Sequence, residues 1–578
     1  CTFFSNSADS GGGIENYNGS KPTMVNCRLS GCSANYSGAG ISNYPGSYST
    51  LTNCTLSSNL GEAMYNGYYA YGPLSKLTNC IVWGNSSGIS GSATVSYSCI
   101  QGGWTGTGNI AVNPLFWNAP MGDLRLHSGS PCLDTGISDG APATDLRGIN
   151  RPQGAGVDMG AYEMNEPDSD GDGLLDDFET EWSNTSPDDP DSDDDGDNDG
   201  EAWFRFRVWH VDVASTSPNP DGTSWETAFP SIQLAIDAAY VRSGGEVWVA
   251  SGTYTASADN VVAMRYNVHL YGGFARSEST REERDWTKYV TVIDGEDTRR
   301  CVLGTNNVPL DGFTVTRGMS SYGGGMYNRS SSPTLTNCAF TRNTASDNGG
   351  GMYNALSSPM VTNCTFTGNA ASSLGGGGIY NFSSSPTLTN CAFSSNSGSG
   401  MYDGSKCDFS SLTNCTFSDN SESGYDGEAD SLTLTGCLFS DNSGVGMRGR
   451  SAAFTVTNCT FRRNSEGGLN IDDGSSSSVT KCTFIENTAN YGGGIDNDFS
   501  STVVEDCVFI GNTSTSTWFG AGGGGINNDG ELSLLEVINC TFLENAAAKW
   551  GGGICNYESA TATLTNCTFF DNSASVSG

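Results

Sequence analysis

The second half of the chain repeats one pattern of apolar and polar positions about every 25 residues. Each copy contains a glycine-rich segment such as "GGGIYN" and a short alternating segment such as "TLTNCTF". Alternation with a period of two predicts half-buried β-strands. An α-helical solenoid does not fit, because there is no apolar stripe of helical period and the repeat is rich in Gly, Ser, Thr and Asn.

A repeat of this length with three short strands predicts one coil of a β-solenoid. In each coil we expect "GGGIYN" as the first strand, "TLT" as the second and "CTF" as the third, with a tight bend at the Asn before the cysteine. Coils stack about 4.8 Å apart, so equivalent residues form columns. The Cys and the Phe of each third strand lie on the same, inward face.

Three columns follow from the repeat. The phenylalanine column contains Phe340, Phe366, Phe393, Phe417, Phe439, Phe461, Phe484, Phe509, Phe542 and Phe569. The bend column contains Asn337, Asn363, Asn390, Asn414, Asn458, Asn539 and Asn566. A second asparagine column contains Asn343, Asn369, Asn396, Asn420, Asn442, Asn464, Asn487, Asn512, Asn545 and Asn572. Asn tolerates left-handed backbone, and its amide can bond the same group one coil away.

The repeat also predicts how the chain is divided. Residues 1–163 carry the same pattern and then a closing cap, and residues 164–202 form an acidic linker. Residues 203–578 form a second array that begins with a capping helix in "TSWETAFPSIQLAIDAAY". The chain begins and ends within a repeat, so we expect either a window of a longer tandem protein or open β-helix ends that associate head to tail.

The net charge of the chain limits the classes of partner that it can bind. The chain carries 63 acidic and 26 basic residues, a formal net charge of −37. Such a charge disfavours nucleic acid and anionic membranes as partners. No apolar run is long enough for a membrane span. The segment from Glu166 to Glu201 holds 17 acidic residues and no basic one, which makes the linker the expected place for cations.

The linker sequence "DSDGDGLLDDFE" has the ligand spacing of a calcium loop. Such a loop takes oxygen ligands at its odd positions and at position twelve, with glycine at the sharp turn. The predicted Ca²⁺ ligands are Asp168, Asp170, Asp172, Leu174, Asp176 and Glu179. A second run, "DSDDDGDNDGEA", supplies Asp191, Asp193, Asp195, Asp197 and Asp199 but lacks the carboxylate at position twelve. A disordered acidic spacer is the alternative.

Several motifs resemble known families. "LDGFTVTRG" followed by "GGGMYN" and "LTNCAF" resembles bacterial secreted right-handed parallel β-helix proteins, and the GGG[IM] and FxxN motifs resemble the chlamydial polymorphic outer-membrane protein repeats. "GDLRLHSGSPCLDTG" with "DMGAYE" resembles the end of β-helix domains in large surface proteins, and the linker resembles thrombospondin type 3 repeats. The resemblance implies an all-β, right-handed parallel β-helix and an extracellular bacterial protein. This fold hosts both adhesins and polysaccharide enzymes.

Two other groups of residues carry candidate chemistry. Most of the 20 cysteines fall once per coil on the inward face, where free buried thiols fit better than disulfides. Six acids follow the first strands of neighbouring coils: Asp403, Asp426, Asp472, Asp473, Asp496 and Asp498. Acids on adjacent coils can act in acid–base catalysis, with Arg448 and Arg450 as nearby bases. The alternative, which the sequence favours, is that the acids replace asparagines in a polar ladder.

The sequence therefore predicts an extracellular structural or adhesive β-helix without enzymatic activity, which forms or projects a stiff fibre by head-to-tail stacking. Ca²⁺ is the expected cofactor, and a polysaccharide or a cell-surface ligand is the expected external partner. The alternative is a polysaccharide-binding or polysaccharide-cleaving β-helix, which acids gathered around one groove would favour. A surface adhesin that binds a receptor as a single copy is a third possibility.

Overall fold

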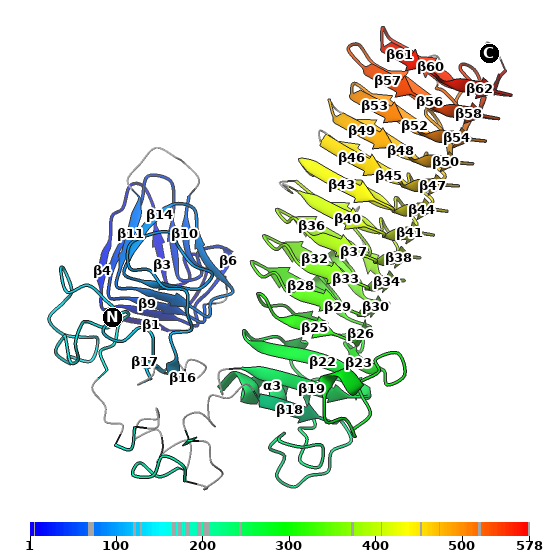
Figure 1. The fold of residues 1–578 in the computed structure, drawn as a ribbon. Helices are drawn as coiled ribbons and strands as arrows, with labels where there is room; N and C mark the ends of the chain where they lie inside the picture. The colour runs from blue at the N-terminus through cyan, green and yellow to red at the C-terminus, as the bar shows by residue number, and fades with distance from the viewer. Residues whose placement is uncertain are drawn as a thin grey trace. The chain divides into compact units, whose positions relative to one another are not determined.

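The computed structural model describes the chain except residues 5, 60, 68–73, 119–122, 128–129, 165–168, 172–175, 177–178, 180–184, 193–197, 200–206, 242–243, 372–374, 406, 408, 451–452, 473, 518–521 and 576–578. The chain forms two compact units. The first contains Cys1–Val208, Asp237–Glu246 and Tyr266–Val268, and the second contains Trp209–Ile236, Val247–Arg265 and His269–Gly578. Each unit is built of coils whose strands pair in parallel, as the repeat predicts (Figure 1).

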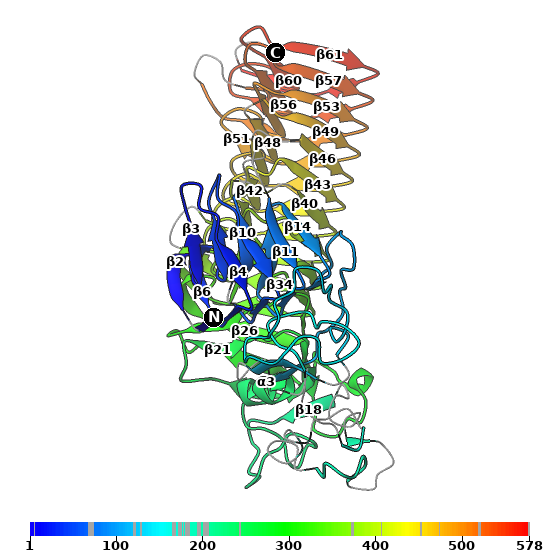
Figure 2. The same cartoon turned by 90° about the vertical axis from the view of Figure 1, so that its left-hand side faces the viewer.

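Three long parallel sheets run through the second unit, and Figure 2 shows their strands stacked coil upon coil. Sheet 1 contains β21 (Asn260–Ala263), β24 (Arg300–Leu303), β28 (Met326–Arg329), β32 (Met352–Ala355), β36 (Ile379–Phe382), β39 (Met401–Asp403), β42 (Tyr425–Gly427), β45 (Met447–Arg450), β48 (Leu469–Asp472), β52 (Ile495–Asp498), β56 (Ile526–Asp529) and β60 (Ile554–Asn556).

Sheet 2 contains β18 (Arg207–Val211), β19 (Gly245–Ala250), β22 (Val268–Phe274), β25 (Pro309–Asp311), β29 (Thr334–Thr336), β33 (Met360–Thr362), β37 (Thr387–Thr389), β40 (Ser410–Thr413), β43 (Ser431–Thr435), β46 (Ala453–Thr457), β49 (Ser476–Thr480), β53 (Ser501–Glu505), β57 (Leu534–Ile538) and β61 (Thr561–Thr565). Sheet 3 contains β20 (Gly252–Tyr254), β23 (Thr291–Asp294), β26 (Phe313–Thr316), β30 (Ala339–Thr341), β34 (Thr365–Thr367), β38 (Ala392–Ser394), β41 (Thr416–Ser418), β44 (Leu438–Ser440), β47 (Thr460–Arg462), β50 (Thr483–Ile485), β54 (Val508–Ile510), β58 (Thr541–Leu543) and β62 (Thr568–Phe570). Helix α3 (Ile232–Val241) lies within the expected capping segment.

One coil illustrates how the repeat folds. Strand β32 leads into β33, and a bend at Asn363 leads into β34. Asn363 has a φ of 54°, a left-handed conformation that Asn adopts more readily than most residues. These three strands are the three that the repeat predicts, in the predicted order. A short fourth strand, β35 (Ala370–Ala371), follows β34 and was not predicted.

The core of the second unit is a set of columns. The phenylalanine rings from Phe340 to Phe542 are 0% exposed. They stack on one another with centroids 4.6 to 5.0 Å apart. The second asparagine column is also buried from Asn343 to Asn545. Each of its amides bonds the amide and the backbone of neighbouring coils, as Asn396 does to Asn420 at 3.0 Å and to the carbonyl oxygen of Phe366 at 3.0 Å.

The glycine tracts before sheet 1 have a steric cause. At Gly378, a Cβ atom would lie 2.3 Å from the carbonyl oxygen of Gly400 on the next coil and 2.8 Å from the Phe393 ring. Real Cβ atoms do not approach backbone so closely, and a residue with a side chain would force the coils apart. The tract therefore lets the backbone pass directly over the next coil and the phenylalanine column.

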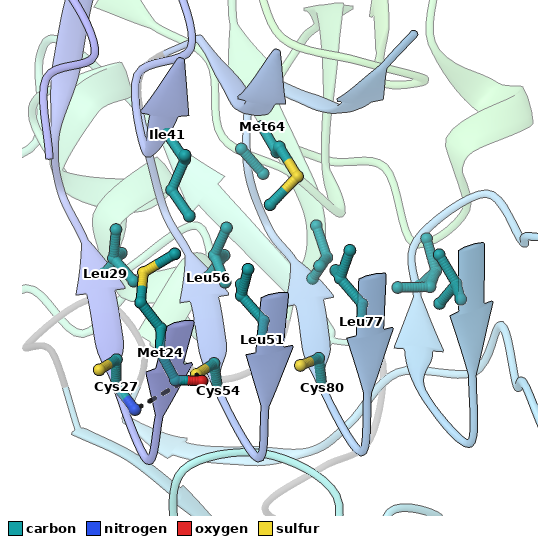
Figure 3. Packing of buried hydrophobic residues seen from close by; sticks show 14 residues of the cluster. Met24, Cys27, Leu29, Ile41, Leu51, Cys54, Leu56, Met64, Leu77 and Cys80 are labelled. Atoms are coloured by element: carbon teal, nitrogen blue, oxygen red, sulfur yellow. Dashed lines mark hydrogen bonds between the residues drawn. The ribbon is translucent and has the colours of Figure 1, made fainter. Parts of the chain in front are cut away.

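The first unit repeats this architecture on a smaller scale. Its three main sheets contain β1 (Thr2–Phe4), β5 (Arg28–Ser30), β9 (Thr55–Ser57), β12 (Ile81–Trp83) and β15 (Cys99–Ile100); β3 (Ile14–Asn16), β7 (Ile41–Asn43), β10 (Glu62–Asn66) and β13 (Ser87–Ser90); and β4 (Thr23–Val25), β8 (Thr50–Thr52), β11 (Ser75–Thr78) and β14 (Ala93–Ser96). Figure 3 shows its apolar side chains in rows, with Cys27, Cys54 and Cys80 on successive coils.

The segment expected to close the first array packs along its side as well as over its last coil. It contains the antiparallel pair β16 (Phe116–Asn118) and β17 (Asp123–Leu126). The amide of Asn53 donates to the carbonyl oxygen of Asp158 at 3.0 Å. A buried ion pair holds the segment together, because Arg151 Nη1 lies 2.6 Å from Glu163 Oε2 with both side chains 1% exposed. The segment thus satisfies bend groups on successive coils.

The cysteines are free thiols, and all but Cys1 and Cys567 are buried. In both units the backbone N–H of one cysteine points at the sulfur of the next coil, at 3.4 Å for Cys27 to Cys54 and for Cys338 to Cys364. Burial raises the pKa of Cys301 to about 12, so this thiol stays neutral. Buried and without disulfide partners, the cysteines from Cys27 to Cys555 pack as small core residues, as the sequence predicts.

Candidate functional site

The outward-facing positions of sheet 1 bring chemically distinctive residues into one line. In β28 and most of its neighbours the first and third residues are buried and the second and fourth are half-buried, so the second residue points outward. Asp426 in β42 and Asn527 in β56 hold the same position but are buried, at 9% and 1% exposed. Strand register places these second residues in one column, which we call the outer column: Tyr327, Tyr353, Tyr380, Tyr402, Asp426, Arg448, Asn470, Asp496 and Asn527.

Four tyrosines form the first half of the outer column. Their ring centroids lie 5.6, 5.4 and 5.3 Å apart from Tyr327 to Tyr402, with nearly parallel planes. The guanidinium of Arg300 lies 4.7 Å from the centroid of the Tyr327 ring, at the start of the stack. Because the ring faces cover one another, the ring edges and the phenol hydroxyls are what the stack presents outward. Burial raises the pKa of Tyr353, so its hydroxyl keeps its proton.

Acids and arginines dominate the second half of the outer column. Further acids and one arginine occupy the fourth residue of each strand, which also faces outward. We call this group the acid–arginine cluster: Asp426, Arg448, Arg450, Asp472, Asp496, Asp498 and Asp529. Arg450 Nη1 lies 3.0 Å from Asp426 Oδ1. Arg448 lies between two acids, 3.8 Å from Asp426 and 4.0 Å from Asp472. Burial raises the pKa of Asp426, and both arginines oppose this rise.

Asp496 is the acid in this cluster with the most perturbed environment. Asn527 Nδ2 donates a hydrogen bond of 2.8 Å to its Oδ1. Burial raises the pKa of Asp496 to about 7, with further contributions from the carboxylates of Asp472, Asp498 and Asp529. A carboxyl group that titrates near neutral pH can donate or accept a proton during catalysis. The arrangement can therefore support proton transfer on the open face of the β-helix.

Asp403 belongs to a different structure. It is inward-facing and 0% exposed, and it ends a ladder of amides in which Asn381 Nδ2 donates to it at 2.6 Å. Ser410 and Tyr425 also donate to it, at 2.7 and 2.8 Å. Asp403 thus replaces an asparagine in a polar ladder, which is the alternative that the sequence analysis favoured. Asp426, Asp472, Asp496 and Asp498 do not, because they occupy outward positions. Asp473 lies outside the described residues.

The tyrosine stack is the feature that the sequence analysis missed. The repeated "MYN" and "IYN" put Tyr at one fixed position of the first strand, and this constancy is the signal that was available. Strand alternation would have placed the side chains outward and stacking would have aligned them.

Only part of the predicted calcium site lies in the described part of the chain. Asp168, Asp172, Leu174, Asp193, Asp195 and Asp197 lie outside it. Asp176 accepts hydrogen bonds from the backbone and hydroxyl of Ser169, at 2.8 and 2.7 Å. Asp199 accepts one from the backbone of Ser192 at 3.1 Å.

Three further predicted ligands are described. Glu179 is buried, with the Thr185 hydroxyl 3.3 Å from its Oε1. Asp170 and Asp191 are half-buried. Within the described residues, no group of three or more His, Cys, Asp and Glu side chains is arranged around a metal position. The calcium loops therefore stay a prediction. The described residues also contain no helix that is long and apolar enough to cross a membrane.

Comparison with known proteins supports the β-helix fold and finds enzymes among the proteins that the chain resembles. A family model described as "Right handed beta helix region" matches residues 301–447 and 404–569. Two mannuronan C5-epimerases of Azotobacter vinelandii, AlgE2 and AlgE1, are 35% and 34% identical to the chain over 101 residues. These matches cover 16% of this chain, and they span only 10% and 7% of the two epimerases.

The solved structures that match the chain are more distant from it in sequence. PfbA, a surface adhesin of Streptococcus pneumoniae, is 13% identical, with a TM-score of 0.34 over 60% of this chain and 89% of that chain. The catalytic unit of a GH87 α-1,3-glucanase from Streptomyces thermodiastaticus is 15% identical, with a TM-score of 0.35 over 58% and 67%. The A-module of the A. vinelandii epimerase AlgE4 is 14% identical, with a TM-score of 0.30 over 60% and 95%.

One prediction from the sequence is overturned here. We predicted a protein without enzymatic activity, but the curated relatives at 34–35% identity are enzymes. The physical reason for the error is that four of the acids were assigned to a polar ladder, whereas strand register places them outward beside two arginines. The parallel sheets, their register and the matched family model together establish the fold: the chain is an all-β, right-handed parallel β-helix.

Proposed function

We propose that the second unit binds an extended polysaccharide along the outer face of sheet 1 and modifies it at the acid–arginine cluster, outside the cell. The observation that carries the proposal is the outer column itself, in which a tyrosine stack continues in register into Asp426, Arg448 and Asp496. The 34–35% identity to mannuronan C5-epimerases supports a polysaccharide as the ligand class.

A repeating surface suits a repeating ligand. The tyrosine hydroxyls recur once per coil, at ring spacings of 5.3 to 5.6 Å. Sugars carry dense hydroxyl groups that hydrogen-bond to such donors and acceptors, while the ring edges supply apolar contact. A polymer that lies along the coil axis would meet the same group on each coil, so many weak contacts add along its length.

Removal of two hydroxyls tests the binding face. In the full chain, the double substitution Tyr353→Phe with Tyr380→Phe keeps the stack but removes two hydrogen-bonding groups of about 0.5–1.5 kcal/mol each. We expect polysaccharide affinity to fall about tenfold, measured by affinity electrophoresis against a panel of neutral and acidic polysaccharides. Thr389→Val is the matched control, because Thr389 ends β37 on the outer face of sheet 2. If no polysaccharide binds, or if the control loses as much affinity, the proposal is wrong.

We also propose that the linker binds Ca²⁺ through the two predicted loops. Bound Ca²⁺ would neutralise carboxylates that otherwise repel one another, and the linker would become compact. Chelation should then raise the rate of proteolytic cleavage within residues 164–202 at least tenfold, measured by limited proteolysis and mass spectrometry. Asp170→Asn combined with Asp191→Asn should be cleaved equally fast with or without Ca²⁺. A cleavage rate that chelation leaves unchanged argues for a plain acidic spacer. Head-to-tail association and a fibre role stay predictions.

A further inference from the structure

We infer that the site on sheet 1 hydrolyses glycosidic bonds of a neutral polysaccharide, with Asp496 as the proton donor. The inference rests on the proposed function and goes further, because it assigns a substrate class, a reaction and a catalytic residue. It is drawn from three features of β45, β48, β52 and β56: a positioned acid, buried acceptors beside it, and the balance of charge around it.

The acid is positioned by a neighbour on the next coil. Asn527 donates to Asp496 Oδ1 at 2.8 Å and is itself 1% exposed. An amide this deeply buried has little freedom, so it fixes the carboxyl group on the outer face. Burial raises the pKa of this carboxyl to about 7, and the group therefore holds its proton in a large fraction of molecules at neutral pH.

Two buried acceptors lie on either side of this acid. Asn470 precedes Asp496 in the outer column and Asn527 follows it. The side-chain oxygen Oδ1 of each is buried and has no hydrogen-bond donor in the described part of the chain. A buried acceptor without a donor costs about 1–3 kcal/mol. Sugar hydroxyls are donors of the right kind. Because both oxygens are closed to solvent, side chains around them must shift before a glycan across β48, β52 and β56 can satisfy the two amides.

The local charge favours a neutral sugar over a uronate. Arg448 and Arg450 are the only basic residues of β42, β45, β48, β52 and β56. Both are already engaged with Asp426, at 3.8 and 3.0 Å. The carboxylates of Asp472, Asp498 and Asp529 raise the pKa of Asp496 through their charge. A uronate carboxylate at this position would meet the same repulsion without a free cation to balance it.

The reaction balances with water as the co-reactant. The carboxyl of Asp496 gives its proton to the glycosidic oxygen as the bond between that oxygen and the anomeric carbon breaks, and the bonding electrons leave with the oxygen. A water molecule forms the new bond to the anomeric carbon. Asp472, on the neighbouring coil, accepts the proton that water loses. The products are two shorter sugar chains. Exchange with solvent then removes the proton from Asp472 and returns one to Asp496.

The test uses the full chain and a panel of polysaccharides. Glucans, galactans, mannans and chitin represent neutral polymers, and alginate and polygalacturonate represent uronates. We expect new reducing ends from at least one neutral polymer and none from the uronates. Asp496→Asn should lower kcat about 10²- to 10⁴-fold while the dissociation constant for the polymer changes less than threefold. Glu505→Gln, on β53 of the same coil but facing out from sheet 2, should retain full activity.

Two further readouts separate a proton donor from a residue that merely shapes the site. An oligosaccharide glycoside with an activated aryl leaving group, such as 2,4-dinitrophenolate, needs no protonation of that group, so Asp496→Asn should cleave it at close to the wild-type rate. The kcat/KM of the wild type should fall as the pH rises through about 7, because the carboxyl of Asp496 then loses its proton. This pH dependence should be absent in the variant.

The outcomes distinguish this inference from the proposed function. If alginate or polygalacturonate is modified and neutral polymers are not, the inference is overturned and the proposed function stands. The same holds if a neutral polymer binds but stays intact, or if Asp496→Asn keeps more than half of the activity on natural polymer. If no polysaccharide binds, both are overturned.

Discussion

Substitution of Asn420 by leucine is expected to destabilise the second unit by about 3 to 5 kcal/mol, because several buried polar groups would lose their partners at once. Asn420 is 0% exposed. Its amide nitrogen donates to the carbonyl oxygen of Phe393 at 3.2 Å and to Asn442 at 2.9 Å. Its side-chain oxygen accepts from the backbone and the amide of Asn396, at 3.2 and 3.0 Å. Leucine has a similar volume but can make none of these bonds.

The effect can be measured as a shift of the urea midpoint of the full chain, followed by circular dichroism. Asn390→Gly is the matched control. Asn390 lies in the bend column, is exposed, and has a φ of 54° that glycine adopts without strain. We expect the control to change stability by less than about 1 kcal/mol. Equal midpoints for Asn420→Leu and wild type would show that the second asparagine column does not stabilise the coils.

Substitution of Phe417 by alanine is expected to cost about 3 to 5 kcal/mol, the range for removal of a buried aromatic side chain from a packed core. The Phe417 ring is 0% exposed and stacks between Phe393 at 4.6 Å and Phe439 at 4.9 Å. Its neighbours cannot close the gap, because strand pairing holds the coils at their spacing. The substitution would therefore leave a cavity and break the column in the middle.

The same column supplies the control for this prediction. Phe569 occupies the equivalent place in its repeat and stacks on Phe542, but its side chain is 44% exposed. Because much of that ring is already in water, Phe569→Ala should cost less than half as much as Phe417→Ala. The urea midpoints of the two variants give the comparison. Similar losses at both positions would mean that stacking itself, rather than burial, sets the stability of the column.

The proposed site has a bearing on the stability of the coils that carry it. Asp496 and its neighbours Asp472, Asp498 and Asp529 place four acids on three consecutive coils. Like charges so close together destabilise the folded chain, and a core made of the phenylalanine and asparagine columns offsets that cost. A β-helix can carry such a cluster because each coil is held by its two neighbours along the whole length of three sheets.

The repeat by itself determined the architecture. The period of about 25 residues, the alternation in "TLTNCTF" and the Asn at each bend are local properties of the chain, and they were enough to predict three strands per coil, their order, the phenylalanine column and the free, buried cysteines. Local patterns suffice here because every coil contacts only the coils before and after it, so that the fold repeats one local rule.

Only the tertiary structure decided which acids lie in the candidate site and which belong to the inward-facing ladder. Asp403 and Asp426 stand in neighbouring coils with similar sequence surroundings, yet Asp403 ends an inward ladder and Asp426 lies outward beside Arg450. A shift of one residue moves a strand side chain to the opposite face. The register between strands 22 to 31 residues apart then decides which outward residues meet. Register comes from the packing of whole coils. For that reason the repeat indicates the tyrosine half of the outer column, but only the structure shows which acids and arginines meet in the other half.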